Sequence, residues 1–361
     1  MRPTVPQLQW CVTLIVAALD VVAASDSPVV RGTCDARAVT SNAPAVTWHL
    51  GPREDRREID RWCRAVGRPV VLPTPAGDGT KNPPLLDELV VVTWNAHLFD
   101  GDLPGLVADL RSGRLTGGEP VRHFVVLLQE LFRRGPDVPA FDRDDRSAFA
   151  IPGGEARGRG ARELATSLGL SMLYVPSMRN GPAVSEDRGN AIVSTEPLHD
   201  LFAIELPLER QRRVSVGASI DVQLNNSQKR VALVSAHLEP LSSPALLWVF
   251  RSPRPRQLTW LLQVLHVERV HEPTSSAGTV LGGDFNTIQA GAAEDVYARA
   301  RGWSRSLLSE DPRPTHLLGR LDYLFFRLQA GWRAHTTRVD RRYGSDHHAV
   351  LGRITREQKS P

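Results

Sequence analysis

Several short apolar runs of this sequence end in residues that could bind a hard metal ion or transfer a proton. Asn95 follows VVVTW, Glu130 follows VVLLQ, and His237 follows VALVSA. The pentapeptide GGDFN at 282–286 places Asp284 and Asn286 directly after another apolar run. A solvated strand end or a tight turn explains each occurrence equally well when it is taken alone. Their recurrence favours an active site over four unrelated turns.

Asp322 is the more informative residue because it lies inside the apolar run RLDYLFF. A lone buried carboxylate costs several kcal/mol, so it needs a partner or must face a polar cleft. The segment GSDHHAVLG supplies Asp346, His347 and His348 just before the last β-rich run. We expect a histidine to pair with Asp322 and His348 to support the strand start. The alternative is a solvent-facing Asp322 on an edge strand.

The elements that must position these residues are mostly short β-rich runs, at 88–94, 123–129, 169–175, 190–194, 213–224, 230–236, 279–283, 320–326 and 348–354. Helices are expected at 104–113, 160–169 and 256–271, and Asn225-Asn226-Ser227 separates two runs in the manner of a hairpin turn. This pattern predicts an α/β fold in which a largely antiparallel sheet packs on a second one, with helices outside.

The N-terminal region is expected to be processed and to form an appendage. An apolar run at 11–19 that is too short to span a bilayer, followed by small residues up to Ala24, predicts a signal peptide over 1–24 and an exported protein, periplasmic or secreted. A buried N-terminal helix is the alternative. Residues 25–86 are expected to pack on the catalytic domain, 87–355, through one helix at 53–67, and 356–361 form a tail.

Cys34 and Cys63 are the two cysteines that remain after such processing. In an oxidising compartment, two cysteines in one region are most simply a disulfide, whereas in the cytosol they would be free thiols. The predicted bridge would restrict the unfolded N-terminal segment and stabilise the fold by a few kcal/mol.

Seven motifs, in the order WNAH, LLQE, RGNAIVS, SAHLE, GGDFN, LDYLFF and SDHHAV, resemble the endonuclease/exonuclease/phosphatase superfamily over about residues 88 to 354. This superfamily contains pancreatic-type deoxyribonucleases, abasic-site endonucleases, neutral sphingomyelinases and inositol-polyphosphate 5-phosphatases. The resemblance implies a four-layer α/β/β/α sandwich of two mainly antiparallel sheets, with the motif residues gathered at one end. It also implies divalent-metal hydrolysis of phosphoesters.

The resemblance assigns a metal site to three residues of this chain. Glu130 matches the family's principal metal-binding carboxylate, Asn95 the asparagine beside it, and Asp346 an acidic residue near the metal. Mg²⁺ is the expected ion, with Mn²⁺ or Ca²⁺ as alternatives, because hard ions prefer oxygen ligands.

The same resemblance implies roles in the reaction. Asp284 and Asn286 match the pair that positions or activates the attacking water and contacts the phosphate, and His237 matches a histidine that binds the phosphate and protonates the leaving oxygen. His347 matches the terminal histidine, oriented by Asp322. A histidine held by a buried carboxylate can act as an acid or a base near neutral pH. The identity of the general base stays open.

Two further residues, Arg188 and Asn190, lie where the family places phosphate-facing groups on the rim, although Arg188 is equally well read as a surface arginine. His97 is left outside the site. In GGDFN we expect the two glycines to let the strand end turn tightly and Phe285 to anchor that turn in apolar packing.

Other enzyme classes lack their signatures here: no G-x-S-x-G elbow, H-E-x-x-H helix or P-loop is present. With 44 basic and 40 acidic side chains, the net charge of +4 only weakly favours a phosphate-bearing partner. The sequence therefore predicts an exported phosphodiesterase, acting on nucleic acid or on a phospholipid head group, without a stable membrane span or an implied protein partner. A phosphomonoesterase and a non-catalytic binding module of the same fold are the alternatives.

Overall fold

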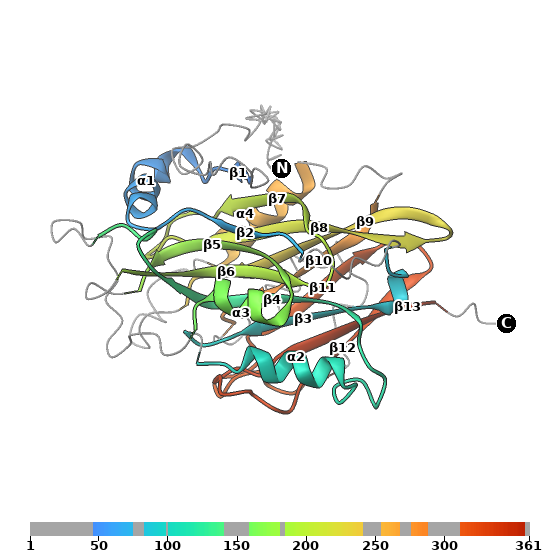
Figure 1. Ribbon diagram of the computed structural model, residues 1–361. Coiled ribbons are helices and arrows are strands. Elements are labelled where there is room, and N and C mark those ends of the chain that lie inside the picture. The colour runs from blue at the N-terminus through green and yellow to red at the C-terminus, as the bar shows by residue number, and fades with distance from the viewer. Residues whose placement is uncertain are drawn as a thin grey trace, which may run out of the picture.

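The computed structural model describes residues 46–74, 83–98, 100–140, 159–180, 185–240, 254–267, 276–287 and 311–357 (Figure 1). The expected signal peptide, Cys34 and most of the expected tail lie outside these ranges. Within them, no helix is both long and apolar enough to cross a membrane.

Two β-sheets form the centre of the fold. One sheet has the order β1-β7-β8-β9-β10-β11 and the other β12-β13-β3-β4-β6-β5-β2. The bounds of the first are Thr47–His49, His199–Glu205, Val214–Leu224, Ser227–His237, Ser276–Asp284 and Asp322–Leu328. Those of the second are Trp332–Arg338, Val350–Arg356, Leu89–Asn95, His123–Arg134, Glu186–Ser194, Ser171–Arg179 and Val70–Leu72. Most neighbours are antiparallel, but β1/β7, β9/β10 and β3/β4 are parallel.

All nine strands expected from β-rich runs are present, whereas β1, β2, β7 and β12 were not predicted. Strands β1 and β2 have three residues each, which is too short for a periodic signal. Strand β12 lies at a sheet edge and alternates polar with apolar residues only weakly. Pairing with a neighbouring strand, more than their own composition, therefore holds β1, β2 and β12 in place.

The main core lies between the two facing sheets. Val91 and Val125 from one sheet and Val216 and Leu233 from the other are completely buried in it. Side chains alternate across each strand, so the opposite face of each sheet also needs cover. This requirement explains the helices.

Helices cover the outer faces and complete the predicted four-layer sandwich. Helices α2 (Leu103–Arg111) and α3 (Ala161–Leu168) pack on the β3-β4 sheet, and α4 (Arg254–Val267) packs on the β9-β10 sheet. Helix α2 begins where the Asp102 carboxylate accepts a hydrogen bond of 2.9 Å from Gly105 N, and α3 ends at Gly169 with φ 66°. Two short 3₁₀ helices, Arg53–Asp55 and Leu86–Glu88, complete the described elements.

The N-terminal segment is more closely integrated than the sequence suggested. The expected helix is present as α1 (Arg56–Arg64), with Ile59 and Trp62 buried. In addition, β1 joins the edge of one sheet beside β7 and β2 joins the edge of the other beside β5 (Figure 1). Covering a sheet edge satisfies its unpaired backbone groups. Residues 46–72 are thus part of the sandwich itself.

The predicted hairpin joins β8 to β9. Leu224 pairs with Ser227, which leaves the two-residue loop Asn225-Asn226 with φ values of 51° and 61°. Two positive φ values define a type I′ turn, which asparagine tolerates better than most residues. The turn sets the register that carries His237 to its place at the far end of β9.

The sheet-to-sheet core predicts a clear stability difference between two leucine variants. Leu233→Ala should lower the free energy of unfolding by about 2–5 kcal/mol, because it leaves a cavity in a fully buried position. Leu317→Ala is the control: this side chain is 87% exposed, and its change should stay within about 0.5 kcal/mol. Urea denaturation followed by circular dichroism measures both. Equal losses would contradict the assigned core.

Candidate active site

Strand pairing gathers the polar residues at one end of the sandwich. In the parallel pair β9/β10, His237 lies opposite Asp284, and in the antiparallel pair β10/β11, Asp284 lies opposite Asp322. In the other sheet, Asn95 ends β3 and reaches across, so that its Nδ2 donates a hydrogen bond of 3.0 Å to Asp284 Oδ2. All four residues are buried, with at most 5% of each exposed. Residues far apart in the chain therefore share one polar cluster.

The GGDFN segment has a different geometry from the one expected. Gly282 and Gly283 lie within β10, and the chain turns only at Asn286, with φ 52°. A Cβ on Gly282 would lie 2.6 Å from a Leu324 methyl, and one on Gly283 would overlap the carbonyl oxygen of Ala236. The glycines thus permit close packing and do not make the turn.

Phe285 anchors the end of this segment in apolar packing, as expected. Phe285 is completely buried and meets Tyr323 and Phe325 edge-on, at ring-centroid distances of 5.7 and 5.2 Å. Asn286 N donates a hydrogen bond of 2.8 Å to Asp284 Oδ1, and its side-chain Nδ2 donates to Leu238 O at 2.9 Å. The turn is held at both ends, which fixes the Asp284 carboxylate.

Glu130 is directed into the site by an irregularity in β4. The register between β4 and β6 shifts between Leu128 and Leu131, and Glu130 has φ 57°. Such a bulge turns a side chain away from the regular alternation of the strand. The Glu130 carboxylate, 22% exposed, lies 3.9 Å from His237 Nε2. The bulge is thus the local device that presents this carboxylate.

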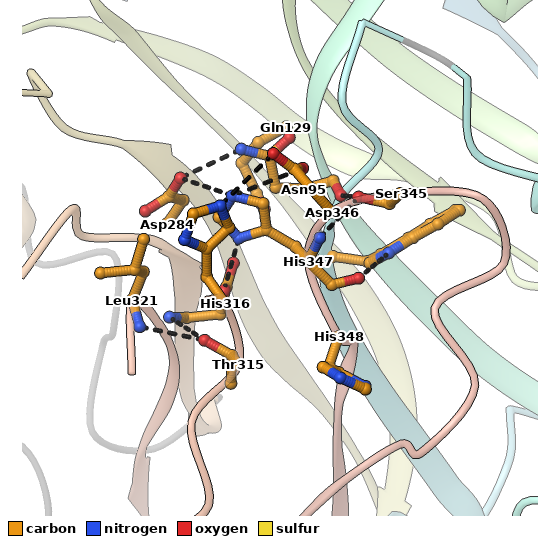
Figure 2. A network of polar contacts seen from close by, with 12 residues as sticks. Asn95, Gln129, Asp284, Thr315, His316, Leu321, Ser345, Asp346, His347 and His348 are labelled. Atoms are coloured by element: carbon orange, nitrogen blue, oxygen red, sulfur yellow. Dashed lines mark hydrogen bonds and ion pairs between the residues drawn. The ribbon is translucent and has the colours of Figure 1, made fainter. Parts of the chain in front are cut away.

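The predicted partnership of Asp322 with a histidine is confirmed. His347 Nδ1 lies 2.8 Å from Asp322 Oδ2. His347 Nε2 lies 3.8 Å from Asp284 Oδ2 (Figure 2). Burial opposes a charge on His347, but Asp322, Asp284 and Asp346 outweigh it and raise the pKa of His347 to about 10. The imidazole is therefore positively charged at neutral pH.

The pKa values of Asp284 and His237 are shifted in directions that give the two residues different roles. Burial, together with the negative charge of Asp322, raises the pKa of Asp284 to about 7, although His347 opposes this shift. Burial lowers the pKa of His237 well below its usual value, and Arg213 and Arg188 lower it further. Near pH 7, Asp284 can therefore exchange a proton, whereas His237 is neutral.

The loop that carries His347 is anchored on β3. His347 N donates to Ser345 Oγ at 3.0 Å, and that hydroxyl donates to Asn95 O at 2.7 Å. Trp94 Nε1 donates to His347 O at 3.3 Å. His348 lies outside this cluster, with its Nδ1 2.8 Å from Val339 O, and it holds the start of β13 as expected.

Asp346 is held between two histidines that were not assigned to the site. Its Oδ1 lies 3.1 Å from His97 Nδ1, and its Oδ2 lies 3.4 Å from His316 Nε2. The His316 ring also lies 4.6 Å from that of His347 (Figure 2). Burial raises the pKa of the Asp346 carboxyl, but the hydrogen bond from His97 and the charge of His347 outweigh it and hold that pKa below its usual range. Asp346 is thus ionised.

The predicted metal ligands offer oxygen atoms suited to Mg²⁺. The Glu130 and Asp346 carboxylates are partly exposed, at 22% and 41% of their side chains. Asn95 Oδ1 accepts one hydrogen bond of 3.0 Å, from His97 N, and a carbonyl oxygen has a second lone pair. Hard cations that keep several waters need only such a small oxygen set. The donor set therefore fits the expected ion.

Two further groups of side chains are compact enough to hold an ion. Within the described ranges these are His316, Asp346 and His347, and Asp284, Asp322 and His347. In the first group, His316 Nδ1 accepts a hydrogen bond of 3.0 Å from Leu318 N, so the neutral ring carries its proton on Nε2, toward Asp346. That tautomer makes His316 a donor to Asp346 and not a metal ligand.

The two predicted rim residues have different surroundings. Asn190 is buried, and its Nδ2 donates a hydrogen bond of 2.8 Å to Val214 O, which ties β6 to β8 of the facing sheet. Arg188 Nη2 lies 3.1 Å from Met178 Sδ, and burial lowers the pKa of its guanidinium to about 10, while the charge of Glu130 opposes this shift. Arg188 is therefore near the predicted metal ligands, and Asn190 is mainly occupied with the backbone.

Several residues at the site gave no signal in the sequence. His316 lies in the loop before β11, and Arg254 is one of several arginines in RSPRPRQ. Neither ends an apolar run, as Asn95, Glu130, His237 and Asp284 do, and neither lies in a motif of the family. Gln129 was not singled out from the sequence either. Its side-chain amide donates a hydrogen bond of 3.0 Å to Ser235 Oγ and so links the two sheets beneath the site.

The fold and the site together define a class of hydrolase: a four-layer sandwich with carboxylate, amide and histidine side chains at one end of its two sheets. The model of the Endonuclease/Exonuclease/phosphatase family matches residues 92–347. That range covers most of the chain, and the protein therefore belongs to this family. It is a phosphoesterase hydrolase at the level that the family defines.

The solved structures that resemble this one are remote in sequence. An endonuclease/exonuclease/phosphatase family protein from Leptotrichia buccalis is 13% identical, with a TM-score of 0.46, over 74% of this chain and 99% of its own. The human Nocturnin catalytic domain with bound sulfate is 17% identical, with a TM-score of 0.46, over 81% and 98%. Sphingomyelinase C from Streptomyces griseocarneus is 16% identical, with a TM-score of 0.39, over 73% and 98%. No curated protein sequence matches the chain.

His347 and His237 should differ in charge above pH 7, and this difference can be measured. In metal-free protein, we expect His347 to remain doubly protonated from pH 7 up to about 10, because Asp322 stabilises its charge, and His237 to be neutral over that range. Asp322→Asn should lower the pKa of His347 markedly, since the burial cost then remains uncompensated. Ring ¹⁵N chemical shifts report both. Asp200→Asn, at an exposed ion pair, should leave them unchanged; a neutral His347 at pH 8 in the wild type would contradict the assignment.

Proposed function

We propose that this protein is an exported, metal-dependent phosphodiesterase that cleaves its substrate with an activated water molecule. The observation that carries this proposal is the Asp322–His347 pair facing Asp284, with Nε2 of His347 3.8 Å from Asp284 Oδ2. It places a positive charge beside a carboxylate that can accept a proton near pH 7. Phosphoester hydrolysis needs both functions in one place.

Asp284 is our candidate for the group that takes the proton from the attacking water. Its two oxygens accept hydrogen bonds from Asn286 N and Asn95 Nδ2, at 2.8 and 3.0 Å, so the carboxylate cannot rotate. A base is most effective when its pKa lies near the working pH, and that of Asp284 is about 7. Asn286 contributes by holding this carboxylate and by lining the phosphate side of the turn.

The two histidines have complementary tasks in this proposal. His347, charged and fixed by Asp322, stabilises negative charge on the phosphoryl oxygens and can return a proton to the leaving oxygen. His237 is neutral, lies 3.6 Å from Asp284 Oδ2 and donates one hydrogen bond to the phosphate. We therefore assign the proton transfer to the leaving group to His347, in place of the His237 role that the family resemblance implied.

Mg²⁺ is the proposed cofactor, with Asn95, Glu130 and Asp346 as the residues that would hold it. When bound, a divalent ion neutralises charge on a phosphate oxygen and orients the attack. His97 and His316 orient Asp346 through contacts of 3.1 and 3.4 Å. Replacing His97 or His316 should weaken metal affinity, although neither is a proposed metal ligand.

The activity prediction uses Glu130→Gln and His347→Ala. With Mg²⁺, the wild type should hydrolyse bis-p-nitrophenyl phosphate, and chelation should abolish this activity. His347→Ala should reduce kcat by about 10²–10⁴-fold because the positive group is lost. Glu130→Gln should reduce kcat/KM by on the order of 10²-fold and raise the Mg²⁺ concentration needed for half-maximal rate.

Glu163→Gln is the matched control, because Glu163 is an exposed carboxylate on α3. It should retain full activity. The proposal fails if metal-loaded wild type cleaves neither bis-p-nitrophenyl phosphate, plasmid DNA nor sphingomyelin. Full activity of both site variants would instead overturn the residue assignment.

Export is proposed from the N-terminal sequence, and it makes a prediction about the mature protein. We expect mass spectrometry of protein recovered from the periplasm or medium to find Ser25 at the N-terminus, after removal of residues 1–24. The same spectra should contain a peptide pair linked through Cys34 and Cys63. Cys63 lies on α1 and is half-buried beside the core, whereas Cys34 is outside the described residues. Two free thiols in exported protein would refute the bridge.

A further inference from the structure

Three arginines interact with the buried residue Glu239, next to the proposed catalytic residues. Glu239 lies two residues beyond His237, and its Oε2 is 3.8 Å from Arg213 Nε. Arg254, the first residue of α4, donates from Nε to Glu239 O at 3.3 Å. Arg188 interacts electrostatically with Glu239 and Arg213. The charges of Arg188 and Arg213 in turn lower the pKa of His237, which burial lowers most. The cluster is therefore adjacent to the histidine.

The donors of these arginines are only partly used. Arg254 is 2% exposed, and both its Nη1 and Nη2 are buried without a hydrogen-bond partner in the described part of the chain. The same holds for the Nε atoms of Arg188 and Arg213. Buried donors in proteins are nearly always paired, so this concentration of unpaired ones indicates a ligand rich in acceptor oxygens.

The charges around Glu239 also favour an anionic ligand. The charge of Glu239 acts on Arg188, Arg213 and Arg254, but burial raises the pKa of its carboxyl, although Arg213 opposes this shift. The charge of Asp284 also attracts Arg254, although Asp284 already interacts with His347. An excess of buried positive charge is stabilised by an anion, and the planar fork of arginine fits the oxygens of phosphate.

We propose that Arg254 and Arg213, beside Arg188, form an anion subsite that binds a substrate phosphate next to the one that is cleaved. This inference rests on the proposed function. The scissile diester has two non-bridging oxygens, and a metal ion held by Asn95, Glu130 and Asp346 would serve them together with His237 and His347. The unused arginine donors are therefore available for a second phosphate.

The subsite selects among the substrates left open by the sequence. Successive phosphates occur along a nucleic-acid strand, where arginine and lysine contacts to them supply affinity. A quaternary ammonium head group would instead place a positive charge beside the arginine cluster, where it would be repelled. The substrate class that fits is a polynucleotide, in preference to a choline phospholipid.

Kinetics with thymidine dinucleotides test the subsite, using molecules that carry an extra phosphate at the 5′ end, at the 3′ end or at neither end. Wild type with Mg²⁺ should cleave one phosphorylated dinucleotide with kcat/KM at least about 10-fold above the unphosphorylated one, mainly through KM. Arg254→Gln and Arg213→Gln should each reduce that preference by about 10-fold. Arg254→Lys, which keeps the charge but loses the fork, should retain part of it.

Arg256→Gln is the matched control on the same helix. Its guanidinium is exposed and makes ion pairs with Glu54, Asp55 and Glu209 at 3.1 to 3.2 Å, away from the cluster. It should keep the wild-type preference. Thermal denaturation identifies variants that do not fold; if Arg254→Gln is among them, Arg213→Gln and Arg254→Lys decide the question.

Two kinetic results would overturn the subsite: equal cleavage of all the dinucleotides by the wild type, or an equal loss on all of them in the arginine variants. Cleavage of sphingomyelin but of no nucleotide would also overturn it. If the wild type hydrolyses no phosphoester, that result contradicts the proposed function but not the subsite. In that case, calorimetry with inorganic pyrophosphate decides: at least about 10-fold weaker binding by Arg254→Gln than by wild type supports the subsite, and equal binding rejects it.

Discussion

The charge of Asp322, completely buried in β11, is the constraint on which the site depends. A carboxylate in that position is stable only with a charged partner, and His347, 2.8 Å away, is that partner. The partner comes from a loop, so the loop must be rigid: Ser345 and Trp94 bind it to the end of β3. The resulting imidazolium then sets the electrostatic environment of Asp284, which is the next carboxylate in the cluster.

Close approach of the strands makes this cluster possible. Gly282 and Gly283 leave space where Leu324 and the backbone of Ala236 come near, so β10 can lie tightly between β9 and β11. Beneath the site, Gln129 and Ser235 hydrogen-bond across the two sheets at 3.0 Å. The end of the sandwich is therefore held by backbone pairing, by packing and by polar contacts, each of which limits the positions of the functional groups.

The site contains charged groups of both signs. Glu130 and Asp346 provide partly exposed carboxylates, which suit a cation. Arg188, Arg213 and Arg254 each have a buried guanidinium nitrogen without a hydrogen-bond partner in the described part of the chain, which suits an anion. His237 is neutral because of burial and of the charges of Arg213 and Arg188.

The sequence by itself determined the strands that contain strong apolar runs, the residues that end them and the need of Asp322 for a charged partner. These features are local, because burial of a run or of a carboxylate has consequences that can be read from its immediate neighbours. The tertiary structure alone decided the edge strands β1 and β2, the bulge that presents Glu130, and the placement of His316 and Arg254. Those features depend on contacts between segments far apart in the chain, and such contacts leave no pattern in the local sequence.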